Sequence, residues 1–283
     1  MNAYLHKLFF DGHGIFAVKA AVCGYAHVEA LNMRDPLEMA SSRKALLGYR
    51  AIAPDHQRDP CPWEAVLLIA KHLLELKTET DTVAAHACLI AFECYTRPSE
   101  LLAVRPCDIV VLREKAVHRY PMISMRLAPS SDELAGGAKA TKAGEFDDTV
   151  VLGDAVSSKF GRAWIADLTA ALAKRRAGLQ QLLPITLGQW EASFRRAVSD
   201  LRLDSLRASP HTLRHGAAST DYALKARDLL EIQRRGRWKA VASVRRYEKS
   251  GRLAAQVALL SPQQLRQARA LATSLPKTLK VSR

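Results

Sequence analysis

Residues 211–247 read HTLRHGAASTDYALKARDLLEIQRRGRWKAVASVRRY. The stretch opens with His211-Thr-Leu-Arg-His215, and it closes with Gly236-Arg-Trp-Lys239 and then Tyr247, nine residues after Trp238. Two histidines four residues apart can bind a metal, but the metalloprotease form of this motif needs glutamate directly after the first histidine. Threonine stands there and no third ligand is evident, so we expect no metal site. A lone tyrosine in a basic helix is usually a packing residue, so other parts of the chain must decide its role.

Two stretches nearer the N-terminus carry further candidate groups. Thr96-Arg-Pro-Ser-Glu-Leu-Leu102 follows a mostly apolar helix, and Lys139 and Lys142 lie in a glycine-containing loop between two predicted strands. Each signal is weak by itself, because an arginine at a helix end usually caps carbonyls or faces solvent. Lysines in such a loop are usually solvated. The order of the signals along the chain is what makes them informative.

Hydrophobic periodicity predicts a mainly helical chain with a short β-rich part. Residues 53–62, APDHQRDPCP, hold three prolines and little apolar content, so we place a domain boundary near residue 58. Ser261-Pro-Gln-Gln264 has the pattern of a helix start with a capping box and opens a C-terminal helical tail over 261–283. Between the boundary and the tail, helices are predicted at 63–76, 80–95, 163–177, 189–201, 211–224, 228–235 and 240–249, and strands at 109–112, 122–127 and 149–152.

The distribution of charge points to an anionic partner. Lys and Arg number 42 against 28 Asp and Glu, and residues 201–283 alone hold 18 basic and 5 acidic residues. A segregated basic region of this kind suits a nucleic acid, with a solubilising surface as the alternative.

Cysteine usage and the absence of apolar spans bear on the compartment. The five cysteines are odd in number and form no C-x-x-C pair, which argues against a disulfide framework or a zinc site. The apolar stretch 14–26 carries Lys19 and is too short to cross a bilayer, and no secretion signal is evident. We therefore expect an intracellular protein without a membrane partner. Bacterial cytoplasm and eukaryotic nucleus are equally compatible.

The ordered signals resemble the catalytic domain of the tyrosine recombinase (phage integrase) family. That family carries an arginine in an R-x-x-E motif, a lysine on a β-hairpin, an H-x-x-R motif, a histidine or tryptophan, and the nucleophilic tyrosine. In this chain the two motifs are Arg97–Glu100 and His211–Arg214. Trp238 takes the histidine-or-tryptophan position, and Tyr247 follows at the usual separation. The likeness extends over roughly residues 63–252.

The resemblance implies a mainly α fold with a small antiparallel β-sheet (α+β). The catalytic domain would span 59–260, preceded by a short helical, core-binding-like DNA-binding domain over 1–58. Both this short N-terminal domain and the long loop at 128–147 depart from the family pattern. The implied partners are double-stranded DNA and other copies of the chain, assembled as a homotetramer on DNA. In the family the C-terminal segment often docks on a neighbouring protomer; packing on its own domain is the alternative.

The residue types suit the roles that the resemblance implies. Arginine presents a planar, permanently charged fork to phosphate oxygens, so Arg97 and Arg214 would hold the scissile phosphate. Trp238 can only donate a hydrogen bond, whereas His211 can be a donor or a base. Tyr247 would be the covalent nucleophile.

Leaving-group protonation is implied to come from the hairpin lysine. We assign this role to Lys142, because Thr141-Lys-Ala-Gly144 looks most like the family's hairpin turn, and Lys139 is the rival. Glu100 is interpreted as structural, and His215 as a packing or supporting residue. Neither cofactor, metal nor ATP is needed, since the arginines neutralise the charge and the phosphotyrosine bond conserves the energy of the phosphodiester.

The sequence thus predicts a site-specific DNA recombinase or integrase that cleaves and rejoins strands through a 3′-phosphotyrosine. Two other interpretations stay open. A type IB topoisomerase would use the same groups to relax DNA as a monomer, and a non-catalytic relic of a mobile element would bind DNA only. A basic helical protein with no nucleic acid role is the least specific alternative. The DNA target, and the choice between integration, excision and resolution, cannot be read from the sequence.

Overall fold

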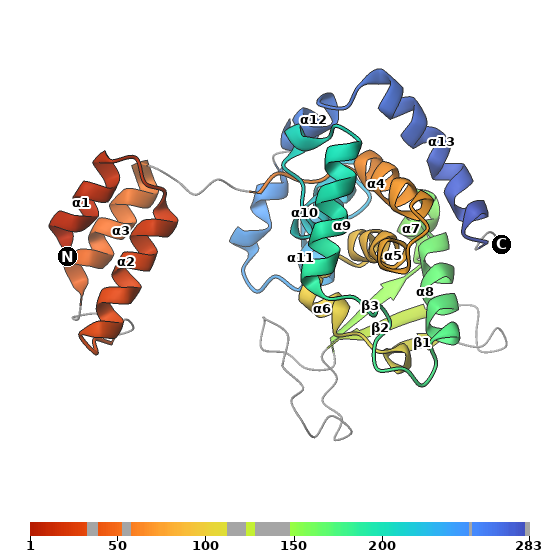
Figure 1. Cartoon of the computed structure of the whole chain (residues 1–283), viewed down its shortest axis with the longest axis horizontal. Coiled ribbons are helices and arrows are strands. Elements are labelled where there is room, and N and C mark those ends of the chain that lie inside the picture. The colour runs from red at the N-terminus through yellow and green to blue at the C-terminus, as the bar shows by residue number, and fades with distance from the viewer. Residues whose placement is uncertain (33–38, 53–57, 112–122, 128–147, 249–250, 281–283) are drawn as a thin grey trace. The chain divides into compact units, whose positions relative to one another are not determined.

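Helices make up most of the chain, and they fall into two units, Met1–Arg58 and Asp59–Arg283 (Figure 1). The computed structural model describes residues 1–32, 39–52, 58–111, 123–127, 148–248 and 251–280. Within these ranges, no helix combines the length and the apolar character needed to cross a membrane.

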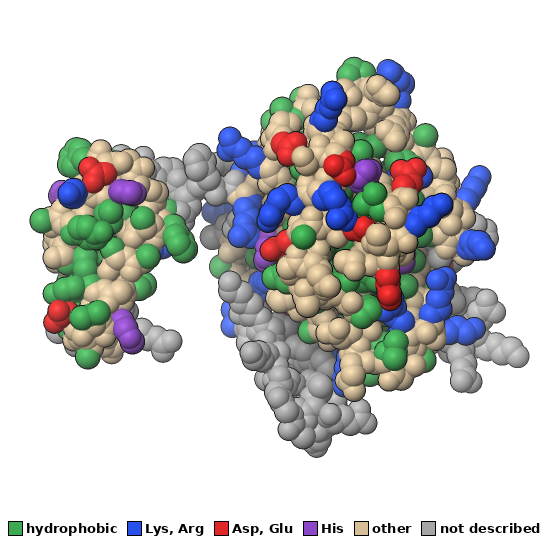
Figure 2. Space-filling model, in the orientation of Figure 1, with side chains coloured by type: hydrophobic (Ala, Val, Ile, Leu, Met, Phe, Trp, Pro, Cys, Tyr) green, Lys and Arg blue, Asp and Glu red, His purple; other side chains and the backbone are tan. Residues whose placement is uncertain are grey.

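The smaller unit is a three-helix arrangement of α1 (Asn2–Phe10), α2 (Ile15–Val28) and α3 (Ala40–Ile52). Its core is formed by Leu5, Leu8, Ile15, Val18, Val22 and Tyr49. Leu5 and Leu8 of α1 are buried, whereas Tyr4 of the same helix lies largely in solvent. Hydrophobic side chains gather on the visible face of this unit (Figure 2).

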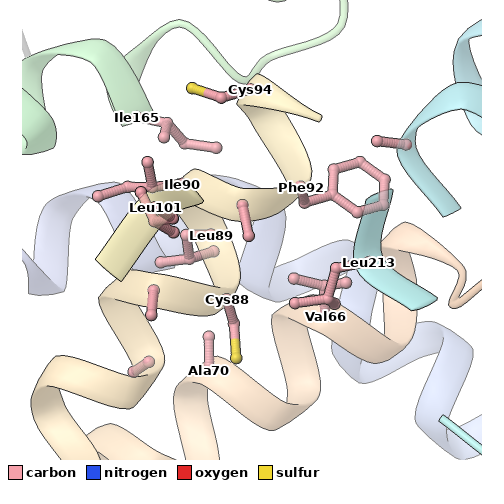
Figure 3. Packing of buried hydrophobic residues seen from close by; sticks show 14 of the residues in the cluster. Val66, Ala70, Cys88, Leu89, Ile90, Phe92, Cys94, Leu101, Ile165 and Leu213 are labelled. Carbon is pink, nitrogen blue, oxygen red and sulfur yellow. The ribbon is translucent and has the colours of Figure 1, made fainter. Parts of the chain in front are cut away.

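The larger unit is built around α5 (Glu79–Cys94), which is buried along almost its whole length. Most of its side chains are apolar and they point to every side of the helix, so it can be stable only when other elements surround it. Figure 3 shows Cys88, Leu89, Ile90 and Phe92 packed among side chains of neighbouring helices. The helices that pack on it include α4 (Trp63–Glu75), α8 (Trp164–Arg175), α9 (Leu187–Asp200) and α10 (Pro210–Ala223). The remaining α-helices of the unit are α6 (Pro98–Leu102), α7 (Ala155–Lys159), α11 (Leu229–Gly236), α12 (Gly251–Ala258) and α13 (Pro262–Thr278).

A three-stranded antiparallel sheet lies at one side of this helical core (Figure 1). Its strands are β1 (Ile109–Val111), β2 (Ile123–Leu127) and β3 (Asp148–Leu152), in that spatial order. Met125 of β2 pairs with Ile109 on one side and with Val150 on the other. Alternate residues of β2 are buried, as expected for a sheet with one face on the core. The predicted mainly α fold with a small antiparallel sheet is confirmed.

The start of the larger unit is fixed against the helix that carries the histidine motif. The Cys61 backbone N–H donates to the Thr212 carbonyl at 3.3 Å, and Asp59 pairs with Arg252 of α12 at 2.9 Å. The segment at Cys61 passes close to α10 at Gly216, where a Cβ atom would overlap the Cys61 carbonyl. Glycine is therefore required there by a close backbone approach.

The tyrosine segment differs from its prediction. Instead of one helix over 240–249, the chain forms two 3₁₀ turns, η4 (Val241–Ser243) and η5 (Arg245–Glu248). Side chains three residues apart eclipse each other in a 3₁₀ turn, so Val244 and Tyr247 both enter the core.

The C-terminal helix α13 packs against α4 of its own unit. Ala268, Leu271 and Leu275 are its buried residues and belong to the main core. Ser261 caps its first turn as the sequence predicts, with its hydroxyl accepting from the Gln264 N–H at 3.2 Å. The described part of the tail therefore packs on its own unit.

Candidate active site

The first candidate arginine lies where the central helix ends. Tyr95 terminates α5 in the left-handed conformation, with φ of 53°, and turns the chain toward α6. Arg97 precedes the first turn of α6, and its backbone N–H donates to Glu100 at 2.9 Å. Its guanidinium also pairs with Glu100, yet the side chain stays 23% exposed. Arg97 is thus held in place while part of it still reaches solvent.

The second candidate arginine, Arg214 of α10, lies deeper. Its Nη1 donates to the Tyr95 carbonyl at 3.1 Å, and its Nη2 donates to the Gly236 carbonyl. The same guanidinium is 3.6 Å from Glu100. Arg97 and Arg214, more than a hundred residues apart in sequence, therefore meet at one carboxylate.

Trp238 covers the guanidinium of Arg214. The Arg214 Cζ atom lies 4.3 Å from the centre of the indole ring, a cation–π arrangement. This approach depends on Gly236, because a Cβ atom there would overlap the ring of Trp238. The glycine and tryptophan of the Gly236-Arg-Trp-Lys239 run thus form one local structure.

Replacing Gly236 by alanine should push the Trp238 ring off Arg214 and slow whatever reaction the site performs. We expect a loss of about tenfold or more, up to the roughly 10²–10³ seen when a preorganised donor is removed outright. Gly188→Ala is the matched control, because a Cβ atom at that helical position meets nothing within 4 Å. Equal rates for the two variants, measured by single-turnover kinetics, would show that the ring position is unimportant.

A third arginine, Arg237, was not singled out by the sequence. Its side chain is only 2% exposed, and its Nη2 donates to Glu100 at 2.9 Å and to the Tyr95 carbonyl at 3.3 Å. The residue adopts a left-handed conformation directly after α11, with φ of 54°. This turn directs the guanidinium back to Glu100. The left-handed conformation of Arg237 cannot be recognised from the sequence, so this contact was not predicted.

Glu100 therefore lies among three guanidiniums, and the cluster keeps a net positive charge. Burial opposes ionisation of Glu100, but Arg237, the Arg97 backbone N–H, Arg214 and the Arg97 guanidinium together lower the pKa of its carboxyl. Burial and the neighbouring charges of Arg97 and Arg237 lower the pKa of Arg214 to about 9. Arg214 is still charged at neutral pH, and an anion bound here would relieve the repulsion.

Buried ion pairs around Asp221 hold Tyr95, whose backbone carbonyl lies in the arginine cluster, in place. The Tyr95 hydroxyl donates to Asp221 at 2.6 Å, and Asp221 pairs with Arg162 at 2.7 Å and with Arg227 at 3.1 Å. The Tyr95 carbonyl accepts from both Arg214 and Arg237. Tyr95 thus links a buried ion-pair network to the two guanidiniums, which limits their movement.

Tyr247 lies beside Trp238, the residue whose ring covers Arg214 of the cluster. The two ring centres are 5.3 Å apart, and the phenol is 3% exposed. The Tyr247 hydroxyl and Arg214 are close enough to interact electrostatically. Arg97, Arg214, Trp238 and Tyr247 are therefore brought together in one site.

Of the two histidines on α10, the one that contacts Tyr247 is not the one that the sequence placed in the catalytic set. His215, interpreted from sequence as a supporting residue, has its Nδ1 2.8 Å from the Tyr247 hydroxyl. His211 lies one turn earlier on α10 and is partly exposed. No three His, Cys, Asp or Glu side chains in the described ranges could hold a metal ion. Lys142 and its rival Lys139 fall outside the described residues.

This helical core with its small sheet is the fold of the tyrosine recombinase catalytic domain. The chain is similar to the Tn1549 transposon integrase (residues 82–397) in complex with circular intermediate DNA, with a TM-score of 0.50 and 12% identity. The alignment covers 90% of this chain and 83% of the integrase chain.

A second similar structure is the XerH site-specific recombinase bound to its difH substrate, with a TM-score of 0.44 and 12% identity over 87% of this chain and 70% of that one. No family model matches the sequence, and neither does any curated protein. The resemblance is thus one of fold, and the roles of individual residues depend on the geometry described above.

Proposed function

We propose that the chain is a site-specific DNA recombinase or integrase that cleaves and rejoins strands through a 3′-phosphotyrosine at Tyr247. The observation that carries this proposal is the convergence of Arg97 and Arg214 on one carboxylate, with Trp238 and Tyr247 beside Arg214. Two guanidiniums, an indole N–H and a phenol hydroxyl match what in-line attack on a phosphodiester requires.

In the proposed reaction, Arg97 and Arg214 bind the non-bridging oxygens, which gather charge as the phosphorus becomes five-coordinate. Trp238 donates a further hydrogen bond to the phosphate. The Tyr247 oxygen forms a bond to phosphorus while the bond to the 5′-oxygen breaks. Lys142 protonates that 5′-oxygen, and the reverse reaction rejoins the strand without ATP.

The proposed partner is double-stranded DNA, bound mainly through its phosphates. Lys and Arg side chains are spread over the visible face of the larger unit, where they outnumber acidic ones (Figure 2). Such contacts give affinity that is independent of sequence and sensitive to salt. We assign residues 1–58 to a core-binding-like DNA contact, residues 59–260 to catalysis and residues 261–283 to the tail, with a tetramer as the assembly on DNA.

The test is a nicked suicide substrate, from which the cleaved end diffuses away so that the covalent intermediate accumulates. We expect a denaturation-resistant protein–DNA adduct to form in EDTA and without ATP. DNA retention with no adduct would contradict the proposal and favour a binding-only relic. An adduct together with relaxation of a supercoiled plasmid, but no recombinant product from paired sites, would favour the topoisomerase interpretation.

A further inference from the structure

The hydrogen-bond partner of the Tyr247 hydroxyl is a second histidine, His215. We propose that His215, rather than His211, accepts the phenolic proton of Tyr247 as the phosphodiester is attacked. This inference rests on the proposed function and identifies the general base of that same site.

The geometry of the pair is that of a base in contact with its acid. The His215 Nδ1 and the Tyr247 oxygen are 2.8 Å apart, within the reach expected for direct proton transfer. With the imidazole proton on Nε2, the hydroxyl donates and Nδ1 accepts. The two ring centres are 6.1 Å apart and the planes are tilted by 38°, so the contact is made by the polar atoms rather than by ring stacking.

Both members of the pair are held in place by their own elements. His215 belongs to α10, the helix that also positions Arg214 and that packs on α5 and on the turn η5. Tyr247 is fixed within η5 by the bond from its backbone N–H to the Val244 carbonyl at 2.9 Å. The phenol is 3% exposed, so bulk water has little access to take its proton.

The reaction needs such an acceptor. A free phenol has a pKa of about 10, so at neutral pH the nucleophile carries a proton that must leave as the bond to phosphorus forms. The positive charge of Arg214 favours the phenolate form of Tyr247. The guanidinium is already protonated, however, so it cannot accept the phenolic proton. A neutral imidazole can, and its ordinary pKa near neutrality suits transfer in both directions.

Helix geometry allows the two histidines to divide the chemistry. His211 and His215 are four residues apart and therefore lie on one face of α10, separated by one turn. His215 contacts the nucleophile. His211, one turn nearer the helix start, is the one that the family resemblance directs to the phosphate, where it would act as a hydrogen-bond donor.

The Tyr247 oxygen bonds to phosphorus and its proton moves to the His215 Nδ1, leaving an imidazolium. The bond from phosphorus to the 5′-oxygen breaks, and that oxygen takes a proton from the general acid, Lys142 in the proposed function. On rejoining, the 5′-oxygen bonds to phosphorus and its proton returns to the neutral general acid. The bond from phosphorus to the Tyr247 oxygen breaks, and the imidazolium returns its proton to that departing oxygen.

The test compares single-turnover adduct formation by wild type, His215→Gln and His215→Ala on the suicide substrate. We expect both variants to be slower by about 10²–10³-fold, because glutamine can keep a hydrogen bond to the phenol but cannot accept its proton. His72→Gln on α4 is the matched control and should react as wild type does. Melting temperature and DNA retention, expected to be unchanged in His215→Gln, separate a chemical loss from a folding loss.

A second substrate distinguishes a base from an acid. When sulfur replaces the 5′-bridging oxygen, the leaving group departs without a proton, so a variant that lacks the general acid recovers its rate. We expect Lys142→Ala to recover and His215→Gln to stay slow. Recovery of His215→Gln would place His215 on the leaving group and overturn the assignment. A His215→Gln rate close to wild type on the ordinary substrate would do the same.

Failure of this inference and failure of the proposed function give different results. If wild type forms no adduct on either substrate, the proposed function is wrong. If wild type forms the adduct and His215→Gln keeps pace with it, only the identity of the base is wrong.

Discussion

Tyr247→Phe is expected to form no covalent adduct, even after prolonged incubation with the suicide substrate. The substitution removes one oxygen atom, and this is the atom that would bond to phosphorus. The phenyl ring can keep its contact with Trp238, whose ring centre is 5.3 Å away. The variant should therefore bind DNA as wild type does, because the loss is confined to the chemical step.

The cost to stability should be small. The variant loses the hydrogen bond to His215, which is itself partly exposed, so we expect about 1 kcal/mol or less from that loss. Tyr222→Phe is the control, since Tyr222 is a partly buried tyrosine of the same unit that lies outside the candidate site. An adduct formed by Tyr247→Phe would mean that a different residue is the nucleophile, and peptide mapping of the labelled adduct would identify it.

The sequence predicted the elements of the catalytic unit because their patterns are local. The apolar run at 80–95 gives the buried helix α5, and Ser261-Pro-Gln-Gln264 gives the start of α13. The three strands were also predicted, within one residue of their observed limits. In each case the signal lies within the element itself, in its periodicity or its caps.

The site was predictable only where a residue's role follows from its own type and position in a motif. The sequence could pair Arg97 with Glu100, but it could not show that Arg237 also reaches this carboxylate, because that contact depends on one left-handed residue. From the sequence we expected His211 to take part in the chemistry and His215 to support it, and nothing in the motif indicates that His215 is the one in contact with Tyr247. Both lie on one helix face, and the position of η5 decides which of them contacts Tyr247.

Arg214→Ala is expected to slow adduct formation by about 10²–10³-fold, the usual consequence of removing a preorganised charge from a developing anion. It should also destabilise the chain. Arg214 is 5% exposed, and without it the carbonyls of Tyr95 and Gly236 lose a donor and Trp238 loses the cation beneath its ring. A buried polar group left without its partner costs about 1–3 kcal/mol.

The comparison with Arg97→Ala separates these two effects. Arg97 is 23% exposed and bonds mainly to Glu100, a residue that keeps Arg237 as a partner when Arg97 is removed. Arg97→Ala should therefore lose a similar amount of rate with little change in melting temperature. Arg195→Ala, on the exposed side of α9, is the control and should change neither quantity.

Arg214→Lys tests whether the fork or the charge matters. Lysine keeps the charge, but its single ammonium cannot reach two carbonyls and a phosphate in one plane as guanidinium does. We expect this variant to regain at most a minor part of the lost rate. If Arg214→Ala cleaves at the wild-type rate while remaining folded, the phosphate is not bound by this arginine, and the convergence at Glu100 is a structural feature of the fold rather than the centre of its chemistry.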